Sequence, residues 1–211
     1  MQLPYESRDK SYLEPELRKR MEISFLEYEK RWPNEPPPFI VETYRSHQKQ
    51  EDLYAQGRTR PGNIVTHVRA GGSFHNYYPT LAFDIAFNIP ASAGGPWSRL
   101  ELFEKFAVIA KELDIEWGGD WKYFVDRPHF QVPRYSIPKA WGEEPVQWNS
   151  LPKWAESYVK QENRTDFRVE VPFDRAYIVT QANEIKELDL EVVNIVNAKL
   201  YLKVRNTIAI E

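Results

Sequence analysis

LAFDIAFN, residues 81–88, has the clearest strand pattern in the chain, and the fold can be worked out from it. Large apolar residues alternate along it with small or polar ones, and this period of two is typical of a β-strand with one face on the core. The apolar set is Leu81, Phe83, Ile85 and Phe87. The other set is Ala82, Asp84, Ala86 and Asn88. We expect this second set to line something open, because the alanines leave room for a partner beside Asp84.

Patterns on both sides of this strand predict helices and further short strands. Apolar spacing of three and four predicts helices over residues 11–31 and 97–113. Ser46 is suited to cap a further helix, over residues 47–56. Strands are predicted over residues 39–44, over 115–121 with a tight turn, and over 124–132 with an interruption at Pro128. The buried face of the third helix is expected to carry Leu100, Phe103, Phe106, Ala107 and Ala110. The predicted class is α+β, with helices on one face of a small antiparallel sheet.

Three regions are expected along the chain of 211 residues. Residues 1–137 hold the predicted sheet and helices and form the main domain. Residues 138–160 are rich in Pro and Trp, and they are predicted to be a linker with a short helix at 152–159. Residues 161–211 alternate strongly in places, which predicts a small β-rich appendage whose role no motif indicates.

Composition excludes several classes of function. The 28 basic and 31 acidic residues give a net charge of −3, which argues against a nucleic-acid binder. There is no cysteine, so disulfides, cysteine-ligated zinc and thiol nucleophiles are excluded. A metal site must therefore use Asp, Glu or one of the histidines, which are His47, His67, His75 and His129. No apolar run is long enough for a signal peptide or a membrane span, so we expect synthesis in the cytoplasm and no membrane insertion.

Two histidines and one aspartate stand on or beside the predicted strands. His75 precedes the 81–88 strand, Asp84 lies on its second face, and His129 follows Pro128. Two imidazoles and a carboxylate are the ligand set of a catalytic zinc site that keeps a fourth position for water. Asp126 could accept that water's proton. Each residue alone has a plainer explanation, since a histidine among aromatics is usually a core or surface residue and Asp84 could be an ordinary strand-edge residue. The combination favours a site for one zinc ion.

Two blocks resemble a known family. They are YRSHQKQEDLYAQGRTRPGNIVTHVRAGGSFHNYYPTLAFDIAF, residues 44–87, and EWGGDWKYFVDRPHFQ, residues 116–131. In this order they resemble the L-alanyl-D-glutamate endopeptidase branch of the D-alanyl-D-alanine carboxypeptidase (VanY-like) superfamily, which includes many phage endolysins. The resemblance covers about residues 39–132. It implies a hedgehog-like α+β domain that binds one Zn²⁺.

The resemblance also implies roles for particular residues. His75, Asp84 and His129 would be the zinc ligands, and Asp126 would be the catalytic base. Arg45 would face the cleft, where its guanidinium could hold a substrate carboxylate or stabilise the developing oxyanion. Ser73 would bind substrate, although a Ser at this position could equally cap a turn.

One departure from the family pattern lies between the first two ligands. Relatives usually have six residues between this His and Asp, with a Gly in the middle. Here there are eight, and Tyr78, Pro79 and Thr80 stand where the Gly is expected. An even insertion keeps Asp84 in the same strand phase if the extra residues bulge from the loop.

The function implied by the resemblance is zinc-dependent cleavage of the L-Ala–D-Glu bond in peptidoglycan stem peptides. One alternative is a D,D-carboxypeptidase or D,D-dipeptidase acting on D-Ala–D-Ala, because those relatives share the ligands. Another is a non-catalytic zinc-binding module, against which Asp126 and Arg45 argue. A monomer is expected to act on the cell wall after release, either through membrane holes made by a holin or as a virion component.

Other polar residues near these blocks have plainer expectations. The turn Trp117–Trp121 is expected to pack beneath the site, with Asp120 capping backbone amides. His67 is expected to be a solvated surface residue, and Gln50 either orients the cleft or faces water.

Overall fold

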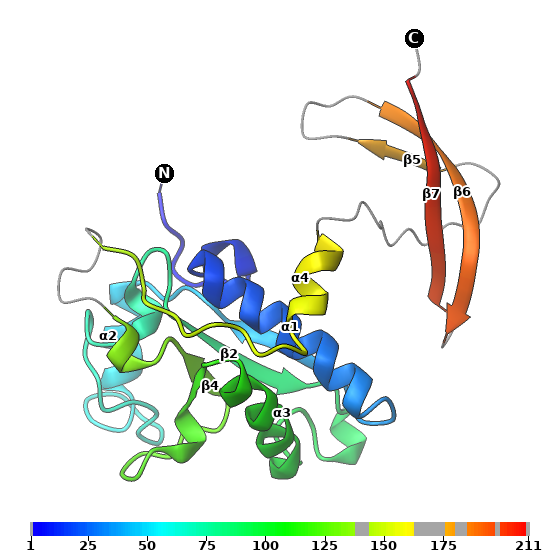
Figure 1. Cartoon of the computed structure of the whole chain (residues 1–211). Coiled ribbons are helices and arrows are strands. Elements are labelled where there is room, and N and C mark those ends of the chain that lie inside the picture. The colour runs from blue at the N-terminus through cyan, green and yellow to red at the C-terminus, as the bar shows by residue number, and fades with distance from the viewer. Residues whose placement is uncertain (1, 138–143, 163–175, 180–184, 197–198, 210–211) are drawn as a thin grey trace. The chain divides into compact units, whose positions relative to one another are not determined.

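The computed structural model describes residues 2–137, 144–162, 176–179, 185–196 and 199–209, and it divides into two compact units, Met1–Pro152 and Lys153–Glu211 (Figure 1). In the first unit the helices are α1 (Pro15–Arg31), α2 (His47–Ala55) and α3 (Leu100–Glu112), and the strands are β1 (Pro38–Glu42), β2 (Ala82–Phe87), β3 (Glu116–Trp117) and β4 (His129–Gln131). The second unit contains α4 (Glu156–Glu162), β5 (Ala176–Val179), β6 (Ile185–Val196) and β7 (Lys199–Ala209). Among the described residues, none of these helices has the length and apolar character that crossing a membrane requires.

The first unit is built on a four-stranded antiparallel sheet of order β1-β2-β4-β3. Asp84 of β2 lies opposite Glu42 of β1 on one side and opposite His129 of β4 on the other. The neighbouring residue Phe83 lies opposite Phe130. The register therefore places polar side chains in one row and aromatic side chains in the next, on opposite faces of the sheet.

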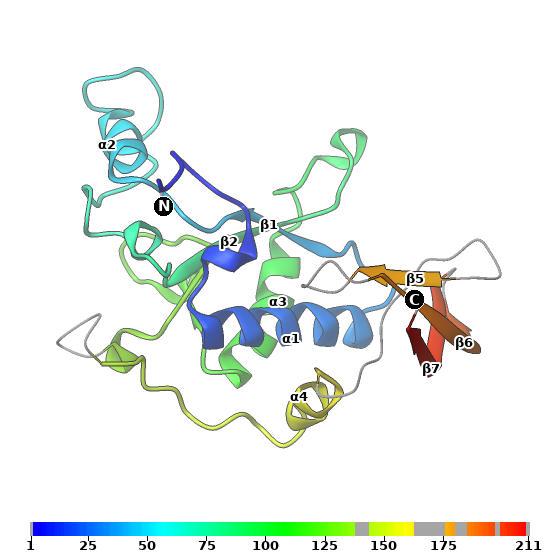
Figure 2. The ribbon, with the colours of Figure 1, turned by 90° about the horizontal axis from the view of Figure 1, so that it is seen from above.

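The aromatic face of the sheet is covered by α1 and α3, which lie side by side in Figure 2. Phe87 of β2 packs against Tyr28 of α1 at 5.6 Å and against Phe103 of α3 at 4.9 Å between ring centroids. Phe106 of α3 meets Phe130 of β4 edge to face. This aromatic core confirms the predicted α+β class with helices on one face, and it leaves the row of Asp84 on the other side of the sheet.

Several element boundaries differ from the prediction. The third helix begins at Leu100 rather than at residue 97, because residues 95–98 form a turn, in which the Ser98 N–H donates to the Gly95 carbonyl, and Arg99 is not helical. Leu100 is therefore 48% exposed instead of buried. The buried face of α3 carries Leu102, Phe103, Phe106, Ala107, Ile109 and Ala110.

The second face of β2 is also less open than expected. Ala82 and Ala86 are fully buried, and within the strand only Asp84 keeps partial exposure. The predicted opening is therefore local, at the position of the carboxylate.

An N-terminal segment extends the sheet beside the end of β1. Ser7 exchanges two backbone hydrogen bonds with residues 43–44, since its N–H donates to the Tyr44 carbonyl and its carbonyl accepts from Thr43. Further along, the Thr80 N–H donates to the Tyr12 carbonyl at 2.7 Å. The first helix therefore starts at Pro15 rather than at residue 11, because the chain before it is paired with the loop that precedes β2.

The loop enlarged relative to the family pattern packs against this N-terminal segment. The Tyr12 ring stacks on Tyr44 with centroids 5.7 Å apart and meets Tyr78 at 5.9 Å. The peptide bond between Tyr78 and Pro79 is cis. Tyr78 of this loop therefore packs against the N-terminal segment, and Asp84 lies opposite His129 of β4. That the two additional residues bulge from the loop stays a prediction.

The second unit contains an antiparallel sheet of order β5-β6-β7 within the described residues. This agrees with the β-rich character predicted for residues 161–211, although the predicted alternating segment at 167–173 lies outside the described residues. The short helix expected at 152–159 is observed as α4, at Glu156–Glu162. The domain boundaries at 137 and 160 stay predictions.

Candidate metal centre

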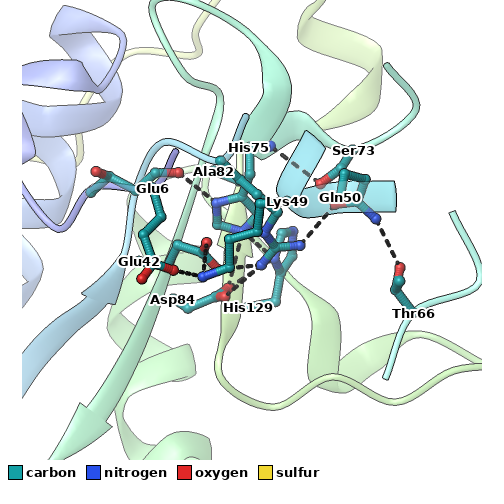
Figure 3. Close-up of polar contacts among 12 residues, drawn as sticks. Glu6, Glu42, Lys49, Gln50, Thr66, Ser73, His75, Ala82, Asp84 and His129 are labelled. Carbon is teal, nitrogen blue, oxygen red and sulfur yellow. Dashed lines mark hydrogen bonds and ion pairs between the residues drawn. The ribbon is translucent and has the colours of Figure 1, made fainter. Parts of the chain in front are cut away.

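Three side chains converge on the polar face of the sheet. His75 comes from a 3-10 helix, Phe74–Asn76, while Asp84 and His129 face each other across β2 and β4. The His75 Nε2 atom lies 3.2 Å from Asp84 Oδ1 and 3.1 Å from His129 Nδ1, and His129 Nδ1 lies 3.0 Å from Asp84 Oδ1. Figure 3 shows the three side chains pointing toward one another.

The outer nitrogens of both rings are occupied by other groups. His75 Nδ1 lies 2.6 Å from the Thr43 carbonyl oxygen, which only accepts, so this nitrogen carries a proton. His129 Nε2 lies 2.9 Å from Gln131 Oε1 and donates to it. In a neutral imidazole the other nitrogen then has a free lone pair. Both lone pairs consequently point at the Asp84 carboxylate and at each other.

This arrangement fits a zinc ion. Two ring lone pairs and a carboxylate oxygen are all acceptors, and hydrogen bonds alone leave them without enough protons. Ligand atoms at about 2.0–2.1 Å around a tetrahedral zinc are separated by about 3.3 Å. The observed separations of 3.0–3.2 Å are close to this value. The three residues therefore suit a cation with a fourth position left for another ligand.

The charges of these groups depend on one another. Burial raises the pKa of the Asp84 carboxyl, but the two histidine rings that face it outweigh burial and hold the pKa well below its usual range. Burial lowers the pKa of His129, but its hydrogen bond to Asp84 outweighs burial, so the net pKa lies above the ordinary value. The negative charge of the Asp84 carboxylate therefore favours a positive charge between these three side chains.

The three side chains line a cleft of about 800 Å³. Lys49 of α2, the loop residues 65–68 and residues 121–124 line the same cleft. The rings of His67 and Phe124 meet at 4.9 Å between these loops. His67 is exposed, as expected, but it also lines the cleft, which its plain sequence context did not indicate.

Arg45 faces this cleft and is held by groups of the chain itself. Its Nη1 donates to Gln50 Oε1 at 3.0 Å, and its Nη2 pairs with Glu42. The same Nη2 lies 3.6 Å from Asp84 Oδ2. Gln50 is fully buried, so of its two expected positions the structure has the one that orients the cleft. Lys49 also pairs with Glu42, as Figure 3 shows. No sequence pattern indicated Glu42 or Lys49, because charged residues on a strand and on a helix usually face water.

Asp126 lines the cleft, in the loop before β4. Burial raises the pKa of its carboxyl, and the negative charge of Asp84 adds to this effect. Its backbone N–H donates to the Gly118 carbonyl at 3.0 Å. A Cβ at position 118 would lie 2.5 Å from the Asp126 carbonyl oxygen and 3.2 Å from His129 Cβ. Gly118 therefore permits the close approach that places Asp126 and His129.

Ser73 has the contact expected of a turn cap. Its Oγ accepts from the backbone N–H of His75 at 3.4 Å, which secures the start of the 3-10 helix. Ser73 also lines the cleft, so its substrate role stays a prediction.

The turn at residues 117–121 differs in part from its expectation. Trp117 is buried beneath the site as expected, at 7% exposure. Trp121 instead lines the cleft, with its ring 5.1 Å from that of His129. The expectation for Asp120 was wrong, because its side chain pairs with Lys111 at 3.0 Å rather than capping the turn.

Comparisons with known proteins match the same region. The family model described as D-alanyl-D-alanine carboxypeptidase matches residues 66–132. The peptidoglycan L-alanyl-D-glutamate endopeptidase CwlK of Bacillus subtilis is 43% identical over 104 residues, which are 44% of this chain and 59% of that protein. The L-alanyl-D-glutamate peptidase of Listeria phage A118 is 61% identical over 33 residues, which are 16% of this chain and 12% of that protein.

Among solved structures, the chain is similar to the L-Ala D-Glu endopeptidase ChiX of Serratia marcescens, with a TM-score of 0.39 and 20% identity over 59% of this chain and 83% of that one. The chain thus spans well under two thirds of the length of the curated relatives that it matches. The family match spans His75, Asp84 and His129 and the strands that carry two of them. Through this region the chain is similar to the D-alanyl-D-alanine carboxypeptidase family.

Proposed function

We propose that this protein is a zinc-dependent peptidoglycan hydrolase that cleaves the L-Ala–D-Glu bond of stem peptides. The observation that carries the proposal is the meeting of three acceptor atoms at 3.0–3.2 Å, with the outer nitrogens of both histidines already bonded. The choice of bond follows the 43% identity to a protein named as an L-alanyl-D-glutamate endopeptidase.

In this proposal one zinc ion would be held by His75, Asp84 and His129, whose converging atoms are His75 Nε2, Asp84 Oδ1 and His129 Nδ1. When bound, zinc would supply a Lewis acid that polarises the scissile carbonyl and makes water a nucleophile at neutral pH. The Thr43 carbonyl and Gln131 already hold the outer nitrogens of the two rings, which orients both rings for the metal.

The remaining site residues act on the substrate and on the proton. Asp126 accepts the proton of the attacking water and passes it to the leaving amine, a role supported by its place in the cleft beside His129. Arg45 stabilises the developing oxyanion or holds a substrate carboxylate, and Gln50 and Glu42 keep its guanidinium in place. Ser73 also lines the cleft, where its hydroxyl binds substrate.

The proposed partner is the stem peptide of peptidoglycan, and the protein acts on the cell wall as a monomer. It reaches the wall either through holes made by a holin or as part of a virion. Both routes suit the match to a phage peptidase.

Digestion of purified muropeptides, followed by mass spectrometry, tests the proposal. We expect products with a new L-Ala carboxyl and a new D-Glu amine. EDTA should abolish their formation, and added Zn²⁺ should restore it. Release of D-Ala instead would assign a D,D-carboxypeptidase. Full zinc occupancy without turnover would assign a binding module, and cleavage that resists EDTA would overturn the metal mechanism.

A further inference from the structure

Beyond the three candidate ligands, a chain of hydrogen bonds runs across the sheet from His129. Gln131 lies two residues after His129 on β4, so both side chains are on the same face of the sheet. Glu116 of β3 lies opposite Gln131 in the register. Gln131 Oε1 is 2.9 Å from His129 Nε2, and Gln131 Nε2 is 3.0 Å from Glu116 Oε1. Gln131 is only 3% exposed, so water does not compete for these bonds.

The carboxylate at the far end sets the direction of the whole chain. An ionised carboxylate accepts hydrogen bonds and donates none, so the amide NH₂ of Gln131 must face Glu116. The amide oxygen then faces His129, and the Nε2 of that ring must carry a proton. The Nδ1 lone pair is thereby left pointing at Asp84 and His75. Without the carboxylate, the amide could turn around and accommodate the opposite tautomer.

Glu116 is itself held in place from several sides. Its Oε1 also accepts from Trp121 Nε1 at 2.9 Å, and its Oε2 accepts from the Arg134 backbone N–H at 3.2 Å. The Trp121 ring lies against His129 with centroids 5.1 Å apart. Glu116 therefore fixes two neighbours of the His129 ring, one by hydrogen bonding and one by packing.

We propose that Glu116, acting through Gln131, is a positioning residue that holds His129 in the tautomer and orientation in which Nδ1 binds the metal. The inference rests on the metal site of the proposed function, but not on which peptide bond is cut. Outer partners of metal-binding histidines commonly contribute about 10- to 100-fold to metal affinity.

The first test is a double-mutant cycle on the full chain, with zinc affinity measured by competition against a chromophoric chelator. Gln131→Leu should raise the Kd for zinc by about 10- to 100-fold. Glu116→Gln should raise it less, because the new amide permits both orientations of Gln131. The double variant should bind zinc within about twofold of Gln131→Leu alone, since the hydrogen-bonded route through Gln131 is then gone and the amide of Glu116→Gln still offers Trp121 Nε1 an acceptor oxygen. Exposed Gln147→Leu and Glu29→Gln are the matched controls, with unchanged affinity expected.

The second test exchanges the two side chains and also serves if Gln131→Leu fails to fold. Gln131→Glu alone sets two carboxylates against each other and should weaken zinc binding. Adding Glu116→Gln restores a donor opposite an acceptor and should recover most of the lost affinity. NMR of the zinc-loaded protein should show a hydrogen-bonded Nε2 proton on His129 in the wild type and in the exchanged pair, but not in Gln131→Leu.

Additive losses in the cycle, or an exchanged pair no better than Gln131→Glu, would overturn the inference. These outcomes are separate from the proposed function. If zinc binds and the cycle behaves as expected while no stem peptide is cut, the peptidase proposal fails and the positioning role stands. If peptide is cut normally by variants whose zinc affinity is unchanged, only the positioning role fails.

Discussion

His129 and Asp126 stand three residues apart, yet the proposed function gives them separable tasks. We expect His129→Ala to lose zinc and activity together, because it removes one of three ligand atoms. Asp126→Asn should keep one zinc per chain and lose about 10²- to 10⁴-fold in turnover, the usual contribution of a general base. Elemental analysis alongside muropeptide turnover measures both quantities. Loss of zinc from Asp126→Asn would mean that this carboxylate is a ligand rather than a base.

Gly118 illustrates how a residue without a side chain shapes the site. We expect Gly118→Ala to destabilise the protein by about 1–3 kcal/mol, because the added methyl would overlap the Asp126 carbonyl at 2.5 Å. Activity should fall as well, since Asp126 and His129 must shift together. Urea denaturation and turnover measure the two effects.

Gly71→Ala is the control for this substitution. A Cβ there meets nothing within 4 Å, but the backbone is left-handed at φ +80°. Gly71→Ala should reduce the free energy of unfolding by about 1–2 kcal/mol with little change in turnover. Equal loss of turnover in both variants would show that the contact at Gly118 is not what matters.

Among single residues, the sequence indicated the candidate metal ligands, which stand in recognisable motifs. It did not indicate the residues that form hydrogen bonds behind those ligands. His75, Asp84 and His129 were selected because their types match a zinc ligand set. Glu116 and Gln131 were missed, because a polar residue on a short strand looks like a solvated one. A signal was nevertheless present, since Gln131 follows His129 by two residues and must share its face.

Among the elements, those with a clear period or cap were predictable. The strand β2 and the Ser46-capped helix α2 were found within one residue of their ends. The start of α3 and the pairing of Ser7 with residues 43–44 were not predicted. Isolated backbone pairs between distant segments leave no period in the sequence, and a turn such as residues 95–98 can occupy the expected start of a helix without altering the apolar spacing that follows.

A surface ion-pair cluster connects the loop after α1 with α3 and the residue before it, and it gives a pH prediction. Glu35 pairs with Lys105 and, at 2.8 Å, with Arg99. The hydrogen bond from Lys105, followed by that from Arg99, lowers the pKa of the Glu35 carboxyl. A group whose folded pKa is lowered stabilises the protein above its unfolded pKa, about 4.3 for Glu, and loses this effect as pH falls through the folded pKa.

Glu35→Gln should therefore reduce stability at pH 7, by under about 1 kcal/mol for an exposed cluster. The difference from wild type should shrink as pH falls below about 4, and also in high salt. Urea midpoints at neutral and acid pH measure it. A difference that stays constant across this range would mean that the charge of Glu35 is not the cause.

For the whole molecule, the site and the cleft lie within the first compact unit. The cleft-lining residues run from Val41 to Arg134, and this unit ends at Pro152. We expect a chain cut after Pro152 to bind one zinc and to cleave soluble muropeptides within a few-fold of the full chain. The segment before the cut should be kept, because Arg20 donates to the Asn149 carbonyl at 2.6 Å and Trp148 lies over its guanidinium.

Comparing the two chains on intact walls would then give the role of the second unit. Equal rates on walls would exclude a wall-binding role for it. A truncated chain that neither folds nor binds zinc would show that the units depend on each other.

The alternation along β2 and β4 has a consequence for changes in chain length. Phe83 and Phe130 share one face, and Asp84 and His129 share the other. Inserting a single residue within 82–84 would exchange the two faces, so that a ligand would point among the helices and a phenylalanine into the cleft. The loop 76–80 lies before β2 and has no such parity. Engineered insertions belong in that loop, and the strands should keep their exact length.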